Sequence, residues 1–146
     1  MPTVSRYFIR SGIVFMVCSL VLAVAMALPP GWGKPAWLGA MTMTQLHLFV
    51  VGWITQIIFG VAIWFFPNKS RDDPRGPAWL GWTCFLSLNL GLVGRFVAES
   101  AAAQGYVEGV WPWAASAAAL LQAVAALSFA LLIWPRVKGR RRSRRG

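Results

Sequence analysis

The stretch QLHLFVVGWITQIIFGVAIWFFP, residues 45–67, decides the fold class and contains the single histidine of this 146-residue chain. It carries no Asp, Glu, Lys or Arg. The hydrocarbon core of a bilayer is about 30 Å thick, and about 20 helical residues cross it. The stretch therefore predicts a transmembrane helix with one imidazole, His47, near one of its ends.

The composition of the whole chain agrees with this. It is 58% hydrophobic and 12% charged, whereas soluble domains carry roughly a quarter charged residues. Four apolar runs are long enough to span a bilayer, at residues 7–28, 43–66, 78–98 and 109–134. Short connections join them, and a basic tail at 135–146 follows. We expect a single transmembrane domain over residues 1–146, an all-α integral membrane four-helix bundle.

The basic residues indicate the orientation of this bundle. Twelve of the fourteen Lys and Arg residues lie near the N-terminus, as Arg6 and Arg10, in the connection 68–77 or in the tail. With four spans these segments share one side, and the other side has only Lys34. Cytoplasmic loops carry an excess of Lys and Arg, which predicts N-in and C-in topology. We expect the bacterial inner (cytoplasmic) membrane, with both termini cytoplasmic.

The tail is unusually basic but directly follows a span. A basic segment in that place is typical of a topology anchor attracted to anionic lipid. The lipid bilayer is therefore the expected partner of the tail, and we expect no nucleic acid.

The remaining basic residue, Arg95, lies inside the third run. His47 is about 6 Å from its end of the second run at 1.5 Å per residue, and Arg95 falls at nearly the same depth on the antiparallel third run. Ionisable residues inside a membrane are costly and usually pair or serve a function. We expect Glu99 one turn higher, at the surface.

Two interpretations of this level match stay open. In the structural one, Arg95 extends to the headgroups or pairs with Glu99 at i,i+4, and His47 binds a helix carbonyl. In the functional one, a neutral imidazole ligates a metal centre and Arg95 binds an anionic group of the same cofactor. Haem fits the second interpretation, because its iron takes an axial His and its propionates need cationic partners. The spacing does not exclude a chlorin.

The faces of the second run support a site on one side. On an α-helical wheel, one face holds Thr44, His47, Val51 and Thr55, and the opposite face centres on Gly52, Gln56 and Gly60. Glycines let another helix approach closely. The histidine face is then left for a flat ligand.

The second and third runs carry a resemblance to a known family. HLFVVGWITQIIFGVAIWFFP, with His47, Gly52, Trp53, Gly60 and Pro67, resembles the second helix of the haem-copper oxidase subunit I superfamily. It is most similar to the short four-helix relatives of cytochrome c oxidase subunit I and nitric oxide reductase. SLNLGLVGRF, with Asn89, Gly91 and Gly94, is similar to their third helix. The resemblance covers about 55 residues.

The resemblance implies haem b on the outer side of the membrane, with His47 as the axial iron ligand. We expect the cofactor-binding residues to be His47, Arg95, Thr44, Val51, Thr55, Trp53 and Asn89. Gln45 stands where the short relatives often have a further histidine. The oxidase subunit takes its other metal ligands from later helices that this chain lacks, so we expect neither oxygen reduction by the isolated chain nor a copper site.

The resulting expectation is a membrane cytochrome b for electron transfer or diatomic gas binding. The sixth iron ligand is open: Met41, Met43, water, an open position, or a second His47 in a homo-oligomer that shares one haem. Two alternatives remain. The chain is either a pigment-binding subunit of a larger respiratory or photosynthetic complex, with bacteriochlorophyll on His47, or a structural or assembly subunit without a cofactor. We expect no enzymatic activity of the isolated chain.

Overall fold

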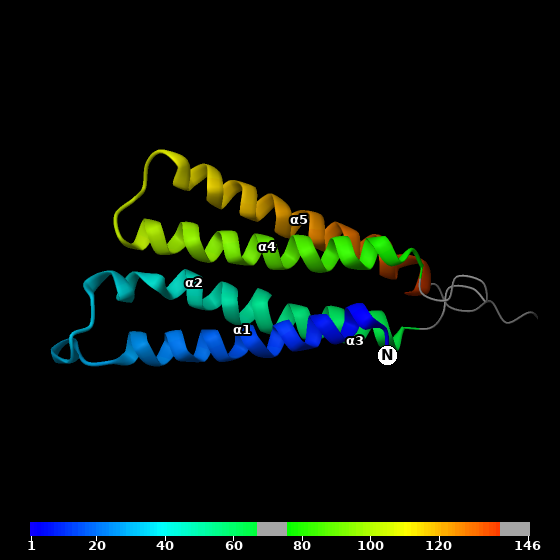
Figure 1. Cartoon of the computed structure of the whole chain (residues 1–146), viewed down its shortest axis with the longest axis horizontal. Coiled ribbons are helices and arrows are strands. Elements are labelled where there is room, and N and C mark those ends of the chain that lie inside the picture. The colour runs from blue at the N-terminus through cyan, green and yellow to red at the C-terminus, as the bar shows by residue number, and fades with distance from the viewer. Residues whose placement is uncertain (67–75, 138–146) are drawn as a thin grey trace, which may run out of the picture.

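The computed structural model describes residues 1–66 and 76–137, and all secondary structure within them is helical (Figure 1). Four helices are long and apolar enough to cross a membrane, namely Thr3–Ala27, Ala36–Phe65, Ala78–Ala103 and Val110–Val137. The predicted all-α class is therefore confirmed for this part of the chain. The connection 67–75 and the tail 138–146, with most of the predicted cytoplasmic charge, lie outside the described residues.

Each helix extends beyond one end of the apolar run that predicted it, because polar and small residues there continue the helical backbone. Helix α1 (Thr3–Ala27) starts after Pro2 and stops before Pro29, after which comes the short 3₁₀-helix η1 (Pro30–Trp32). Helix α4 (Ala78–Ala103) includes the turn after residue 98, and α5 (Val110–Val137) follows it. Gly105 and Gly109, with φ of 96° and 73°, make the turn between them, a conformation that glycine adopts without steric cost.

The second long helix is built from four consecutive elements. They are the 3₁₀-helix η2 (Ala36–Met41), α2 (Thr42–Leu46), the π-helix η3 (His47–Thr55) and α3 (Gln56–Phe65). The hydroxyl of Thr55 donates to the carbonyl oxygen of Val50, five residues earlier, at 2.9 Å. A π-helix has wider turns than an α-helix. The predicted α-helical wheel therefore does not hold between His47 and Thr55.

The helices form two hairpins, which run side by side in Figure 1. Helix α1 packs against η3 and α3 in one hairpin, and α4 packs against α5 in the other. We call the end with residues 28–35 and 104–109 the distal end, and the end with Met1 and Val137 the terminal end.

Glycines allow close approach within both hairpins. A Cβ atom at Gly52 would lie 2.8 Å from Cβ of Phe15, and one at Gly60 would lie 2.9 Å from Cβ of Phe8. The predicted glycine face of the second helix thus contacts α1, as expected. In the other hairpin a Cβ atom at Gly91 would lie 2.8 Å from the carbonyl oxygen of Ala118. The small residues of α5 are part of this packing.

Polar side chains join the two hairpins at mid-height. Gln56 is completely buried and accepts a hydrogen bond at 2.5 Å from the Ser11 hydroxyl of α1. Its amide nitrogen donates to Oδ1 of Asn89 in α4 at 3.2 Å. A buried amide without partners would cost about 1–3 kcal/mol. The Gln56 contacts therefore favour one register between α1, α3 and α4.

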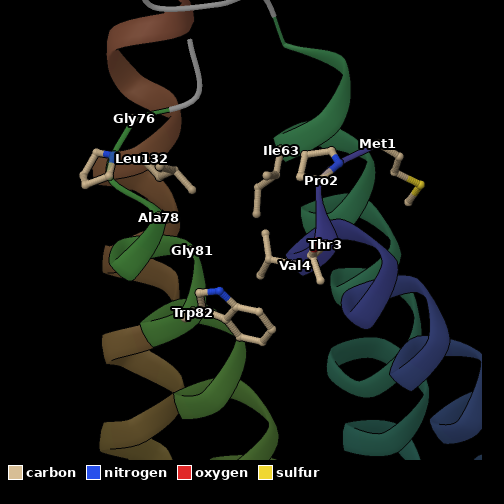
Figure 2. Close-up of a pocket in the computed structure, with 11 residues that line it drawn as sticks. Met1, Pro2, Thr3, Val4, Ile63, Gly76, Ala78, Gly81, Trp82 and Leu132 are labelled. Atoms are coloured by element: carbon tan, nitrogen blue, oxygen red, sulfur yellow. The ribbon is translucent and has the colours of Figure 1, made fainter. Parts of the chain in front are cut away.

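The hairpins separate around a cavity at the terminal end. It has a volume of about 470 Å³, and Figure 2 shows residues of α1 and α3 on one side and of α4 and α5 on the other. Thr3, Val4 and Ile63 face Ala78, Trp82 and Leu132 across it. Near this cavity, Nη1 of the buried Arg136 donates to the carbonyl oxygen of Ile63 at 3.2 Å. This contact links α5 to α3.

Two neighbouring glycines of α4 test the α4–α5 packing. We expect Gly91→Ala to destabilise the protein by about 1–3 kcal/mol, because the added methyl meets backbone that cannot move aside. Gly94→Ala is the matched control, since its nearest contact would be an ordinary 3.4 Å to Cβ of Ala118. Ala in a helix is favoured over Gly, so the control should unfold at the same or a higher temperature. Equal destabilisation of both variants in a detergent unfolding experiment would contradict this packing.

Candidate functional site

The single histidine lies at the junction between α2 and η3, towards the distal end. His47 is the first residue of the π-helix, and its side chain is 26% exposed. Arg95 and Glu99 occupy successive turns of α4, and their side chains are 25% and 19% exposed. All three side chains are thus largely covered by the bundle.

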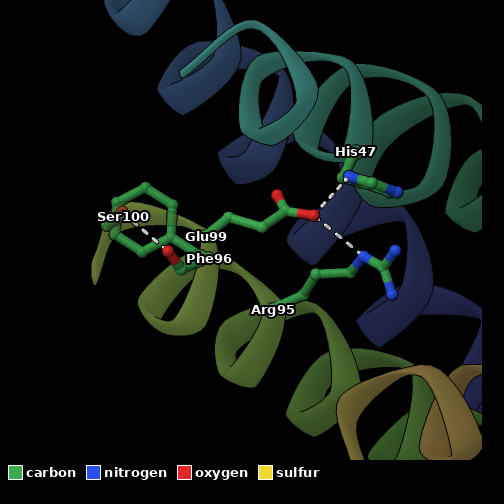
Figure 3. A network of polar contacts seen from close by, with 5 residues as sticks. All are labelled: His47, Arg95, Phe96, Glu99 and Ser100. Carbon is green, nitrogen blue, oxygen red and sulfur yellow. Dashed lines mark hydrogen bonds and ion pairs between the residues drawn. The ribbon is translucent and has the colours of Figure 1, made fainter. Parts of the chain in front are cut away.

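The three side chains meet at one carboxylate oxygen. Nδ1 of His47 lies 3.1 Å from Oε1 of Glu99, and Nε of Arg95 donates to the same oxygen at 3.0 Å (Figure 3). The predicted level match between His47 and Arg95 is therefore present, with Glu99 between them. We call this contact the His47–Glu99–Arg95 cluster.

Glu99 is the residue whose place the sequence analysis gave incorrectly. It was expected at the surface, but its side chain is only 19% exposed, pairs with Arg95 and lies 3.1 Å from the His47 imidazole. A long side chain can reach back along its own helix, and the i,i+4 spacing from Arg95 was the available signal. The structural interpretation proposed that pairing, and the structure contains it. However, His47 contacts the Glu99 carboxylate and not a helix carbonyl.

Not every polar atom of the cluster is satisfied. The contact between Nδ1 of His47 and Oε1 is not aligned as a hydrogen bond, and Oε2 of Glu99 is buried without a hydrogen-bond partner in the described chain. With a neutral imidazole, Arg95 and Glu99 compensate each other's charge. The cluster then has no net charge.

The remaining nitrogens of the cluster are directed elsewhere. Figure 3 shows the outer ring nitrogen of His47, Nε2, and the terminal guanidinium nitrogens of Arg95 pointing away from Glu99, on the side opposite Phe96. Nε2 is therefore the ring nitrogen that is available to a ligand.

The other predicted site residues lie outside the cluster. Thr44 is buried, Val51 packs against the core, and Thr55 bonds its own helix. The ring centroid of Trp53 lies 4.8 Å from that of Phe49, and Asn89 binds Gln56 deeper in the bundle. Of the predicted set, the structure brings only His47 and Arg95 together.

Gln45 has a packing role. Its amide nitrogen donates to the Ser19 hydroxyl of α1 at 3.1 Å, and Ser19 in turn donates to the carbonyl oxygen of Gln45 at 3.3 Å. This pair holds the distal part of the second helix against α1.

Two cavities lie near the cluster. An apolar one of about 390 Å³ is lined by α1 together with Leu48, Val93 and Phe96, and none of the three cluster residues lines it. A smaller one of about 160 Å³ lies between α4 and α5 at the distal end, and its lining includes Glu99, Tyr106 and Trp111. His47 lines neither of these two cavities.

Any metal binding at this site would depend on the imidazole of His47. Within residues 1–66 and 76–137, no group of three or more His, Cys, Asp and Glu side chains could hold a metal ion. Haem iron does not need such a group, because the porphyrin supplies four ligands and the protein one or two. A metal-bound imidazole usually directs its other nitrogen to a carboxylate or carbonyl, which is the arrangement of His47 and Glu99. His47, as an axial ligand, and Glu99, as the carboxylate next to its other ring nitrogen, thus fit a haem iron.

Comparisons with protein-family models, curated proteins and solved structures find no match to this chain.

The ion pair of the cluster can be tested by mutation. We expect Arg95→Leu to destabilise the protein by about 1–3 kcal/mol, because a largely buried carboxylate loses its charged hydrogen-bond donor. Arg10→Leu, at an exposed position of α1, is the control for losing one arginine. Thermal unfolding in detergent should separate the two variants. If both unfold at the wild-type temperature, the pair contributes no stability.

Proposed function

We propose that this chain is a multi-pass membrane protein that binds one b-type haem through His47, for electron transfer or for binding a diatomic gas. The observation that carries the proposal is the geometry of the imidazole. Its Nδ1 lies 3.1 Å from a carboxylate oxygen, and its Nε2 points away from that carboxylate (Figure 3). A carboxylate on one ring nitrogen fixes the ring for ligation through the other.

The π-helix adds support. Such segments are rare and occur frequently at functional sites, and this one begins at His47. The resemblance of this stretch to the haem-copper oxidase superfamily points to the same residue.

Arg95 has a narrower role in this proposal than the sequence indicated. Its Nε is held by Glu99, so its terminal nitrogens are what remains for a haem propionate. Glu99 also offsets its charge. We therefore propose that Arg95 binds a propionate by hydrogen bonds, with the headgroup region taking up the excess negative charge.

The partial exposure of the His47 side chain favours a haem enclosed by more than one chain. The nearby apolar cavity does not include His47, so one protomer covers little of a bound haem. We propose a homo-oligomer, in which a two-fold pair places two His47 residues on one shared haem. Such a pair has half a haem per protomer and a six-coordinate, low-spin iron. A ratio of one haem per protomer with a high-spin spectrum would contradict it.

The bilayer would be the bacterial cytoplasmic membrane, with the distal end and His47 on its outer side. Support comes from the four apolar helices and from the excess of Lys and Arg in the N-terminal, 68–77 and tail segments. Trp32 and Trp113 at the distal end are highly exposed, as expected for rings at a membrane interface. Protease digestion of a C-terminal tag in intact spheroplasts would contradict this orientation.

A second candidate is a structural or assembly subunit of a larger membrane complex. The observation that favours it is the charge balance of the cluster, since Arg95 and Glu99 pair without any cofactor. This candidate predicts a colourless chain from a haem-replete host. Absorption in the red would instead indicate bacteriochlorophyll on His47, the pigment-binding alternative.

Optical spectra of purified variants test the haem proposal. The wild-type chain should show the Soret, α and β bands of a b-type haem after reduction with dithionite. His47→Ala should lose these bands, because no other histidine exists to replace the ligand, whereas Arg95→Leu should retain less haem or shift its midpoint potential. Gln45→Ala is the control and should keep the bands, since Gln45 binds Ser19.

The same spectra, recorded with and without carbon monoxide, distinguish electron transfer from gas binding. Bands unchanged by carbon monoxide would indicate two protein ligands and electron transfer, and bands that shift would indicate an open iron position and gas binding. An unchanged haem spectrum in His47→Ala would overturn the ligand assignment.

A further inference from the structure

Nδ1 of His47 has a restricted environment. The atom is buried and has no aligned hydrogen-bond partner in the described chain, and Oε1 of Glu99 lies 3.1 Å away. Oε1 is itself held by Nε of Arg95 at 3.0 Å. The carboxylate therefore cannot turn from the imidazole without breaking its bond to Arg95.

This geometry distinguishes the two neutral forms of the imidazole. If the proton were on Nε2, the lone pair of Nδ1 would face a carboxylate oxygen at 3.1 Å, and the two would repel each other. If the proton is on Nδ1, an N–H donor lies beside a carboxylate acceptor, and the same contact is attractive. Such contacts are strengthened in a low dielectric, and the bond made by one ring nitrogen sets the state of the other.

We propose that Glu99 is the positioning residue for His47. Its carboxylate holds the proton on Nδ1 and leaves the lone pair of Nε2 directed away from the protein. Arg95 fixes the carboxylate in place. The tautomer is a property of the chain alone, and its use as an iron ligand rests on the proposed function.

The role has a consequence for bound iron. A carboxylate on Nδ1 raises the basicity of the imidazole as a ligand. A more electron-rich ligand stabilises ferric iron over ferrous iron. Glu99 should therefore lower the midpoint potential of a haem bound by His47.

Because the chain has a single histidine, every ¹⁵N-histidine NMR signal belongs to His47, and the tautomer can be measured without resonance assignment. The full chain is labelled with ¹⁵N-histidine, prepared free of haem in detergent and examined by ¹⁵N NMR at a pH where the imidazole is neutral. We expect Nδ1 to carry the proton and Nε2 to have the shift of an unprotonated ring nitrogen. In Glu99→Leu, which has no acceptor, the population should move towards the Nε2-protonated form.

Two further variants complete the test. Glu108→Leu is the matched control, because Glu108 is exposed in the distal turn, and it should keep the wild-type tautomer. Glu99→Gln retains an oxygen that can accept from Nδ1 but loses the charge. It should keep most of the wild-type tautomer and, when loaded with haem, have a more positive midpoint potential.

The outcomes separate this role from the haem proposal. A proton on Nε2 in the wild-type chain overturns the role of Glu99, even if Glu99→Leu does not fold. An unchanged tautomer in folded Glu99→Leu overturns it as well. A colourless chain with the proton on Nδ1 contradicts the haem proposal but supports the positioning role. A haem-binding chain with the proton on Nε2 supports the haem proposal but contradicts the positioning role of Glu99.

Discussion

The contact of His47 and Arg95 with one carboxylate oxygen of Glu99 joins the two hairpins at the distal end of the molecule. In a bundle with an apolar exterior, polar groups have to find partners inside the protein. Gln56 meets the same requirement at mid-height, and Arg136 does so at the terminal end. These polar contacts and the shared apolar core between them set the relative placement of the hairpins, which also enclose a cavity at the terminal end.

The sequence was sufficient to predict the four long helices and the proximity of one pair of site residues, His47 and Arg95. Apolar runs require burial or lipid contact along their whole length, so four spans could be predicted from composition. The depths of His47 and Arg95 followed from the helical rise. The direction of the Glu99 side chain could not be predicted from the sequence. A side chain at a helix end can extend to solvent or fold back onto the bundle. Which of these two orientations it adopts depends on its partner on another helix.

The π-helix was missed for a related reason. It begins at His47 and includes Gly52, whose missing side chain lets Phe15 of α1 and Leu92 of α4 approach. Packing between helices sets the width of this segment, and hydrophobic periodicity within one helix does not report it. An α-helical wheel therefore grouped Thr55 with His47. The glycine face that contacts α1 was still predicted correctly, since close approach of another helix requires a small residue in an α-helix and in a π-helix alike.

Our central claim is that His47 is an iron ligand, and pulsed EPR of the ferric protein tests it most directly. Because the chain has one histidine, ¹⁵N-histidine labelling changes the isotope at that imidazole alone, while the porphyrin nitrogens remain ¹⁴N. The account predicts a ¹⁵N hyperfine coupling of the size expected for an iron-bound nitrogen. A haem signal without such a coupling would show that another group holds the iron, and would contradict the account.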